Sequence, residues 1–416
     1  MGNKVYENKL IILFFCTWGF LFIDRLSITF ILPVIQPDLG INNAQVGILN
    51  LAFTVAWGAS AIVVSSIADK KGNLKRWLLL SGFLTAIFGA MCALSNSFET
   101  LVLFRILVGI SEGPFSTFIM AMLGKSVSED RLGFSVGVVN CGVAVIAAAM
   151  APVLLTQLVA VTSWQMVFFV GALPGLILMF VVAFFVKPIP DTIREDVKQD
   201  QDMQLNKKNM FAELWSYRNF RICFFLAMVH MAGYYILQIF GALYWTNVAG
   251  LSVQTTGMLL SAAGLVGIFT CIFLPKLSDI YGRRPVMLVS YLLSIFPSLF
   301  MFLLPGSTLS MVIFVICASI PGALGIFWIN LIPIETLPKY LTATGISVPM
   351  AMGEFIGGAL ITAIAGVIAD MYGLPTMMII AAVGMVGSFL LCFGIIETAP
   401  RALERKAAKL AAASKE

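Results

Sequence analysis

Charged residues are scarce in this sequence. Of its 416 residues, 11% are Asp, Glu, Lys or Arg, whereas 60% are hydrophobic. Because soluble domains carry about a quarter charged residues, this composition excludes a fold whose surface faces water. The mean hydropathy of +0.97 and the uncharged runs at residues 77–94 and 164–186 indicate segments long enough to cross a lipid bilayer as helices.

These runs also lack the alternation of apolar and polar residues that marks the strands of a membrane barrel. Backbone amides in lipid must bond within the protein, which leaves helices as the spanning structure. We therefore predict an all-α polytopic membrane protein. The first run, at residues 10–33, contains Asp24 and Arg25 and is too long for a signal peptide, so we expect it to remain as the first span.

Side chains suited to metal or covalent chemistry are few. There is one histidine, and the seven cysteines lie mostly in apolar segments, where they behave as small hydrophobic residues. Neither the phosphate-binding pattern GxxxxGK[ST] nor the zinc-binding pattern HExxH occurs. We therefore expect no enzyme, no cofactor and no metal, and we expect transport to draw on a gradient rather than on ATP.

Hydropathy and helix-breaking residues predict twelve spans in two sets of six. They are expected at residues 10–33, 44–67, 77–94, 100–123, 132–159, 164–186, 221–248, 254–277, 285–304, 309–332, 341–369 and 376–396. The charged stretch between the sets predicts a loop. The predicted domains are a six-helix bundle at residues 1–186, a cytoplasmic loop at 187–219, a second six-helix bundle at 220–400 and a cytoplasmic tail at 401–416.

Basic residues indicate the orientation, because Lys and Arg collect on the cytoplasmic side of membrane proteins. All but two of the 26 Lys and Arg residues fall on one side if both termini are cytoplasmic, and the exceptions, Arg25 and Arg105, lie inside spans. We therefore expect cytoplasmic termini in a cell-membrane protein. The net charge of +5 then reflects topology, and no nucleic-acid partner is expected.

An internal repeat connects the two sets. The loop after the second span reads DKKGNLKR at residues 69–76, and the loop after the eighth reads DIYGRRP at residues 279–285. The offset of 210 residues between the two aspartates fits duplication of a six-helix unit. Such loops can form charge networks that open and close during cycling, and the alternative is an ordinary basic loop with a turn glycine. The expected gating residues are Asp69, Gly72, Arg76, Asp279, Gly282 and Arg283.

Both loops resemble the loop signature of the major facilitator superfamily, and this resemblance covers essentially the whole chain. Within that superfamily, Asp24-Arg25 and the segment RILVGISEGP at residues 105–114 are similar to the anion:cation symporters. The resemblance implies transport of sugar acids or other organic carboxylates with protons or sodium. It also implies that Arg25 and Arg105 help to bind the anion and that Asp24 and Glu112 are protonation candidates. One departure is Glu354, where those symporters tend to offer amides and glycines.

The residues themselves support a polar site within the membrane. A charge at the bilayer centre costs at least about 2.5 to 3.5 kcal/mol, so Asp24, Arg25, Arg105 and Glu112 should face one another or water. Arg105 and Glu112 are seven residues apart, which places them on nearly one helical face. Intramembrane charges usually mark substrate paths or proton relays. The alternative is that they form internal ion pairs that fix helix packing.

Other spans offer further candidates. His230, Tyr234 and Gln238 recur every four residues and should form one polar stripe, suited to binding hydroxyl groups. Asn140 and Trp328 are further candidates for substrate contacts, and Glu354 is a third candidate for proton coupling. For the uncharged residues, helix packing is the alternative.

The sequence as a whole favours a proton-coupled symporter of a small organic anion that works by alternating access and acts as a monomer in the lipid bilayer. A drug:proton antiporter would keep the acidic residues, but two arginines in the membrane would repel a cationic drug. A membrane receptor or enzyme is the remaining alternative. The repeated loop argues against a receptor, and the lack of a clustered metal-binding motif argues against an enzyme.

Overall fold

The computed structural model describes residues 4–187, 207–399 and 403. Within these residues, every regular element is a helix, and twelve helical stretches are long and apolar enough to cross a membrane. This confirms the predicted all-α fold with twelve spans. The chain divides into two compact units, which hold Met1–Gln199 with Ala242–Leu265 and Asp200–Gly241 with Val266–Glu416.

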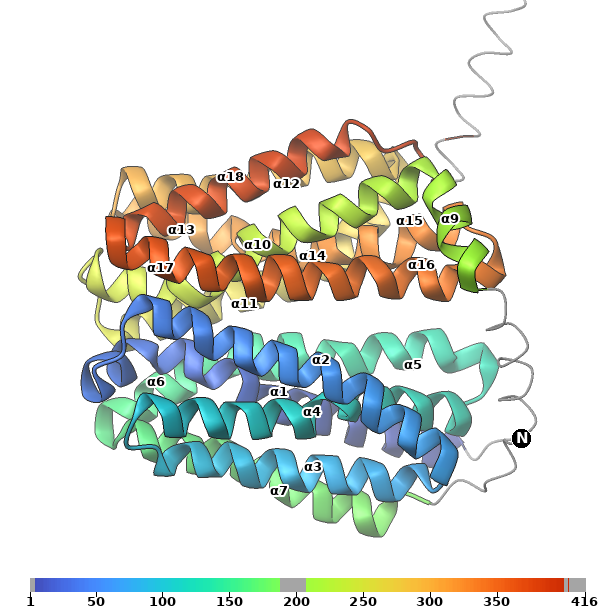
Figure 1. Ribbon diagram of the computed structural model, residues 1–416, viewed down its shortest axis with the longest axis horizontal. Coiled ribbons are helices and arrows are strands. Elements are labelled where there is room, and N and C mark those ends of the chain that lie inside the picture. Colours follow the sequence, from blue (N-terminus) through green and yellow to red (C-terminus); the bar gives the residue numbers. More distant parts are fainter. Residues whose placement is uncertain (1–3, 188–206, 400–402, 404–416) are drawn as a thin grey trace, which may run out of the picture. The chain divides into compact units, whose positions relative to one another are not determined.

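The helices of the N-terminal half lie side by side with their axes roughly parallel (Figure 1). They are α1 (Lys4–Leu39), α2 (Asn43–Lys71), α3 (Leu74–Met91), η1 (Cys92–Leu94), α4 (Phe98–Ser126), α5 (Glu129–Gly142), η2 (Val143–Met150), α6 (Ala151–Val161) and α7 (Trp164–Phe185). Helix α1 packs against α5 and α7, and α4 packs against α2 and α3. Aromatic and aliphatic side chains from α1, α3, α4 and α7 form the core between them.

The C-terminal half begins with a short polar helix. Its elements are α9 (Lys207–Ser216), α10 (Arg218–Asn247), α11 (Val253–Tyr281), α12 (Arg283–Leu303), α13 (Thr308–Cys317), α14 (Ile320–Ile326), η3 (Phe327–Leu331), α15 (Ile332–Thr336), α16 (Lys339–Met352), η4 (Gly353–Ile361), α17 (Thr362–Tyr372) and α18 (Pro375–Cys392). Helices α12 and α18 pack closely together. The core of the second unit gathers side chains from α10, α12, η3 and α18.

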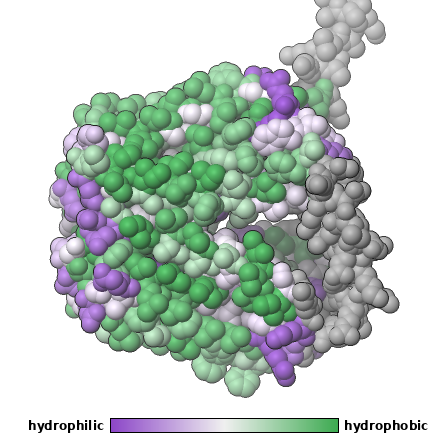
Figure 2. All heavy atoms as spheres, in the orientation of Figure 1, coloured by the Kyte–Doolittle hydropathy of each residue, from purple (hydrophilic) through white to green (hydrophobic). Residues whose placement is uncertain are grey.

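Apolar side chains form a broad band on the viewed face, and hydrophilic residues gather near the helix ends (Figure 2). Many exposed side chains within the spans are large and apolar, for example Ile62, Phe184 and Phe269. A surface of this kind is stable when lipid covers it.

Helices α2 and α4 cross closely at two glycines. An added Cβ at Gly109 would meet the carbonyl oxygen of Phe53, and one at Gly113 would meet the carbonyl oxygen of Trp57 and the Oγ atom of Ser60. Ser60 Oγ also donates a hydrogen bond to the carbonyl oxygen of Gly109 at 3.2 Å. Small residues four positions apart lie on one helix face and let two backbones approach. The crossing therefore brings Phe53 and Trp57 next to α4.

Three features differ from the sequence-based expectations. Helix α1 continues past Pro33, because membrane helices tolerate proline where neighbouring groups compensate for the lost hydrogen bond. The stretch expected to be a loop contains α9, whose Leu214 is buried against Phe220 and Leu341. Three spans contain π-helical segments, η2, η3 and η4. Hydropathy cannot predict them, because it reports how apolar a segment is and not which backbone groups bond to each other.

We expect Gly113→Ala to destabilise the first unit, because the added methyl group would collide with the backbone of α2. Overpacking of this kind costs about 1–3 kcal/mol. Gly58→Ala is the matched control, since an added Cβ at Gly58 in α2 has nothing within 4 Å and alanine is the better helix former. Thermal unfolding in detergent measures both variants. Equal melting temperatures for the two would contradict the close crossing.

Candidate functional site

Arg105 connects α4 to α1. Its side chain is buried, and its Nη1 and Nη2 atoms donate hydrogen bonds to the carbonyl oxygens of Asp24 and Arg25 at 2.9 and 3.3 Å. The guanidinium carbon lies 4.5 Å from the ring centre of Phe53. Two backbone dipoles and an aromatic face thus surround the buried charge. A planar guanidinium with several donors can make these contacts at once, whereas a lysine ammonium cannot.

Arg25 lies among three aromatic rings. Its guanidinium carbon is 5.2 Å from the ring centre of Phe22 and 5.3 Å from those of Phe53 and Trp57. Cations are attracted to ring faces within about 6 Å. Arg25 is only partly buried, so the aromatic group does not cover this cation completely. Phe53 contacts both guanidinium groups and therefore lies between the two arginines.

Asp24 faces α3 at a glycine. The carboxylate is buried, and an added Cβ at Gly89 would lie 2.8 Å from its carboxylate carbon. Gly89 therefore provides the space that the carboxylate occupies. The charges of Arg105 and Glu112 both act on Asp24. The structure thus brings together, in one unit, the four intramembrane charges that the sequence singles out.

Glu112 is the unusual member of this group. The residue is 1% exposed, and neither carboxylate oxygen has a hydrogen-bond partner in the part of the chain that the structure describes. The positive charges of Arg25 and Arg105 act on it. Buried polar groups in native proteins are nearly always hydrogen-bonded, so an unbonded carboxyl inside α4 points to a functional role. It is suited to exchanging a proton or to accepting a hydrogen bond from a bound molecule.

A hydrolase motif at the same place is excluded by the structure. Residues 109–113 read GISEG, which fits the GxSxG pattern of the hydrolase nucleophile elbow. That elbow needs a sharp turn between a strand and a helix. Ser111 instead lies within α4, and its hydroxyl donates to the carbonyl oxygens of Leu107 and Val108 at 3.0 and 2.9 Å. The two glycines of the pattern, Gly109 and Gly113, instead allow the close crossing of α2 and α4.

In the second unit, the predicted stripe of α10 does form. His230 is buried, its Nδ1 atom lies 3.0 Å from the hydroxyl of Tyr291, and its ring lies 6.0 Å from that of Tyr234 and 5.5 Å from that of Trp328. The Gln238 amide donates to the Tyr234 hydroxyl at 3.0 Å. His230 and Trp328 are thus part of a buried aromatic group, whereas Tyr234 and Gln238 are only partly buried.

Glu354 contacts α10 from the π-helical segment η4. The hydroxyl of Tyr235 donates to Glu354 Oε2 at 2.8 Å. Gly358 makes room for this tyrosine, since an added Cβ there would lie 2.9 Å from its ring. The remaining polar candidate, Asn140, is exposed on α5, and its amide donates to the carbonyl oxygen of Val136 at 3.0 Å in the same helix.

Arg283 organises a charge group at the beginning of α12. Its Nη1 atom pairs with Asp279 at 2.6 Å, and its Nη2 atom pairs with Glu335 at 2.7 Å. The backbone N–H groups of Arg283 and Arg284 donate to the carboxylate of Glu397 at 2.7 and 3.1 Å. Glu397 therefore caps the N-terminus of α12, where a negative charge is favourable.

Both repeated loops turn at a glycine with positive φ. The angle is 69° at Gly72 and 108° at Gly282, a region that side-chain-bearing residues rarely adopt. In the first loop, Asn73 Oδ1 accepts a hydrogen bond from the backbone N–H of Arg76 at 3.3 Å. The side chain of Asp69 lies outside the described residues.

Sequence reasoning did not identify Glu335 and Glu397, nor the aromatic group around Arg25. Each glutamate follows the end of a predicted span on the side that carries the basic residues, and this position is a usable signal. The aromatic group has a weaker signal. Phe22 is one turn before Arg25 in the same helix, but Phe53 and Trp57 belong to another helix and approach only through the glycine crossing.

Several known transporters are similar to this chain. A hexuronate transporter of Bacillus subtilis is 27% identical over 268 residues, which are 63% of this chain and 62% of that protein's length. A probable 4-methylmuconolactone transporter of Cupriavidus pinatubonensis is 24% identical over 371 residues, or 87% of this chain and 83% of that protein. A solved structure of a nucleoside transporter superposes with a TM-score of 0.78 at 17% identity and covers 93% of this chain and 99% of its own.

A family model covers most of the chain. It matches residues 10–362, which include the four intramembrane charges, both glycine turns and the Arg283–Glu335 pair. The similar proteins are transporters and not enzymes. The chain is therefore a multi-pass membrane transporter that belongs to the Major Facilitator Superfamily.

Proposed function

We propose that this transporter carries a small organic anion, a carboxylate of the sugar-acid kind, together with a proton by alternating access in the cell membrane. The observation that carries the proposal is Glu112, a buried carboxyl that has no hydrogen-bond partner among the described residues and lies within the field of two arginines. The hexuronate in the name of the Bacillus relative is a sugar acid, which supports this substrate class. A cationic drug fits poorly, because Arg25 and Arg105 would repel it.

Arg25 is the proposed direct contact for the substrate carboxylate. It is the less buried of the two arginines, and a guanidinium can bind a carboxylate through two parallel hydrogen bonds. Arg105 supplies a second positive charge and holds the backbone of Asp24 and Arg25 through its two hydrogen bonds. The aromatic rings around Arg25 keep the guanidinium in position.

Glu112 is the proposed coupling residue. When Glu112 is ionised, its negative charge is attracted to the same two arginines as the substrate carboxylate, and the two anions compete. When it is protonated, that competition disappears and the substrate anion binds more strongly. Proton and substrate binding thus favour each other, which is what symport requires. Asp24 interacts with the charges of Glu112 and Arg105 and is the second candidate for the proton. Sodium as the coupling ion is the alternative.

The second unit has its own candidates for substrate contacts, on α10. Tyr234, Tyr235 and Gln238 present hydroxyl and amide groups along α10, and Glu354 bonds to one of them. Such groups bind the hydroxyls of a sugar acid well, because each can both donate and accept. His230 packs against the ring of Tyr234, and Trp328 packs against His230.

The Arg283 group and its counterpart near Gly72 are the proposed gating elements. Because basic residues collect on the cytoplasmic side, we place both groups at the cytoplasmic ends of the spans. For the same reason we propose that both termini are cytoplasmic. The ion pairs of Arg283 with Asp279 and Glu335 join the end of α11, the beginning of α12 and α15. Breaking and remaking such pairs accompanies switching between two states.

Glu112→Gln should uncouple transport, since glutamine imitates the protonated acid but cannot release a proton. In proteoliposomes, we expect exchange of labelled for unlabelled hexuronate to continue, while accumulation driven by a pH gradient is lost. Glu99→Gln is the control, because Glu99 is an exposed acid of the same helix. Full pH-driven accumulation by Glu112→Gln would remove Glu112 from the coupling mechanism.

Arg25→Lys should weaken substrate binding about tenfold or more, because an ammonium keeps the charge but loses the two-point grip. Arg105→Lys should weaken binding and also lower the melting temperature, since it loses the bonds to α1. Substrate binding by calorimetry and thermal unfolding separate these effects, with exposed Arg221→Lys as the control. If Arg25→Lys binds hexuronate as the unmodified protein does, Arg25 is not the anion contact.

Asp279→Asn should slow the transport cycle several-fold and leave substrate affinity nearly unchanged, because it weakens one ion pair of Arg283 and leaves the α1–α4 charge cluster intact. Initial uptake rates and equilibrium binding measured on the same preparation provide the comparison. Asp370→Asn, at an exposed helix end, is the control. A normal rate with strongly weakened binding would reverse the assignment.

A further inference from the structure

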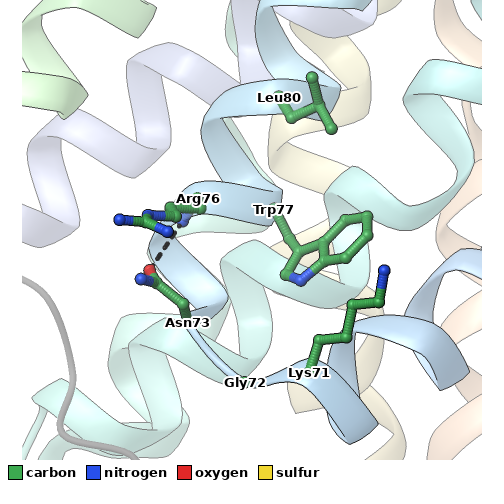
Figure 3. A pocket seen from close by; sticks show the side chains of 6 residues that line it. All are labelled: Lys71, Gly72, Asn73, Arg76, Trp77 and Leu80. Carbon is green, nitrogen blue, oxygen red and sulfur yellow. Dashed lines mark hydrogen bonds between the residues drawn. The ribbon is translucent and has the colours of Figure 1, made fainter.

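A cavity of about 440 Å³ lies at the connection between α2 and α3 in the first unit (Figure 3). Its walls are formed by Lys71, Gly72, Asn73, Arg76, Trp77 and Leu80. The membrane span of α3 begins at Leu74, so the cavity lies where the chain passes between water and the hydrocarbon core. None of these residues belongs to the charge cluster of α1 and α4.

The cavity has a charged end and an apolar end. In Figure 3 the Lys71 side chain extends toward the indole of Trp77, Arg76 lies on the other side beside Asn73, and Leu80 lies further along α3. Lys71 and Arg76 are exposed, and neither pairs with a carboxylate among the side chains that the structure describes. Positive charge therefore marks the water side, and an aromatic ring and an aliphatic side chain mark the membrane side.

We infer that this cavity binds the headgroup of an anionic phospholipid. The phosphate group lies at Lys71 and Arg76, since each Lys or Arg near the membrane surface attracts anionic lipid. Trp77 lies at the level of the glycerol, where its amphipathic ring is favourable. The first part of an acyl chain runs along Leu80 and α3.

The apolar wall distinguishes a lipid from free phosphate, which offers the same charge. A site for free phosphate needs hydrogen-bond donors around the anion, and hydrocarbon next to it adds nothing. Leu80 is 51% exposed on the membrane side of the cavity, and only a ligand with a hydrocarbon chain gains from covering it. Charge and apolar surface together therefore fit a lipid better than a free anion.

The test is lipid binding to the full-length protein, delipidated in detergent and measured by native mass spectrometry. Phosphatidylglycerol and phosphatidylcholine are each added to the protein, and their binding is compared. Glycerol phosphate and inorganic phosphate are then added as water-soluble competitors. The double variant Lys71→Gln/Arg76→Gln removes both cations. Lys4→Gln/Lys9→Gln is matched in charge, because both lysines are exposed on α1 and line no part of this cavity. Leu80→Asn keeps the cations and the net charge and removes only the apolar side chain of the wall.

We expect one phosphatidylglycerol to bind in preference to phosphatidylcholine. The Lys71/Arg76 variant should bind it about thirtyfold more weakly, Leu80→Asn should also bind it more weakly, and the Lys4/Lys9 control should change less than about twofold. Melting temperatures equal to that of the unmodified protein verify that the variants fold. Unchanged binding by the Lys71/Arg76 variant, or equal affinity for the two lipids, would overturn the proposal. Displacement of the lipid by glycerol phosphate or inorganic phosphate at equal concentration would identify a free-anion site instead.

Discussion

The buried guanidinium of Arg105 is the constraint on which the rest of the first unit depends. A charge in hydrocarbon must find its partners inside the protein, and Arg105 finds them in two carbonyl oxygens of α1. These bonds fix α1 against α4 at the level of Arg25. The glycine crossing of α2 with α4 then determines which aromatic rings Arg25 meets. Glu112 lies two turns further along α4, near positive charge, and its carboxylate has no hydrogen-bond partner in the ranges that the structure describes.

The sequence predicts which residues are buried charges far better than it predicts their partners. Hydropathy places all twelve spans, because the apolarity of each run of residues shows that it crosses lipid. It also shows that Asp24, Arg25, Arg105 and Glu112 lie inside two of these spans. It cannot show that Arg105 bonds to backbone atoms, since every residue has a carbonyl oxygen and the choice depends on how two helices pack. The same limit applies to Glu397, which caps a helix from a distant segment.

The two repeated loops share a turn at a glycine, and in the second loop the structure also describes the charges around that turn. Positive φ at Gly72 and Gly282 follows from backbone geometry, and a sequence motif preserves it. In the second unit, the carboxylates of Asp279 and Glu335 engage Arg283. In the first unit, a separate ion pair joins Arg131 at the start of α5 to buried Glu7 at the start of α1 at 2.9 Å. Ion pairs between neighbouring helices thus lie near helix ends in both units.

His230 is the only histidine of the chain, and it lies buried in the second unit with its ring against Tyr234, Tyr291 and Trp328. Isotope labelling of histidine therefore produces a single set of imidazole resonances in a nuclear magnetic resonance spectrum of the unmodified protein. The surrounding rings shift these resonances through their magnetic currents, and the hydrogen bond between Nδ1 and the Tyr291 hydroxyl ties the Nδ1 resonance to that contact. A rearrangement of α10 relative to α12 or η3 changes the ring-current shift and the hydrogen bond. The chain therefore carries its own spectroscopic reporter of motion in its C-terminal half.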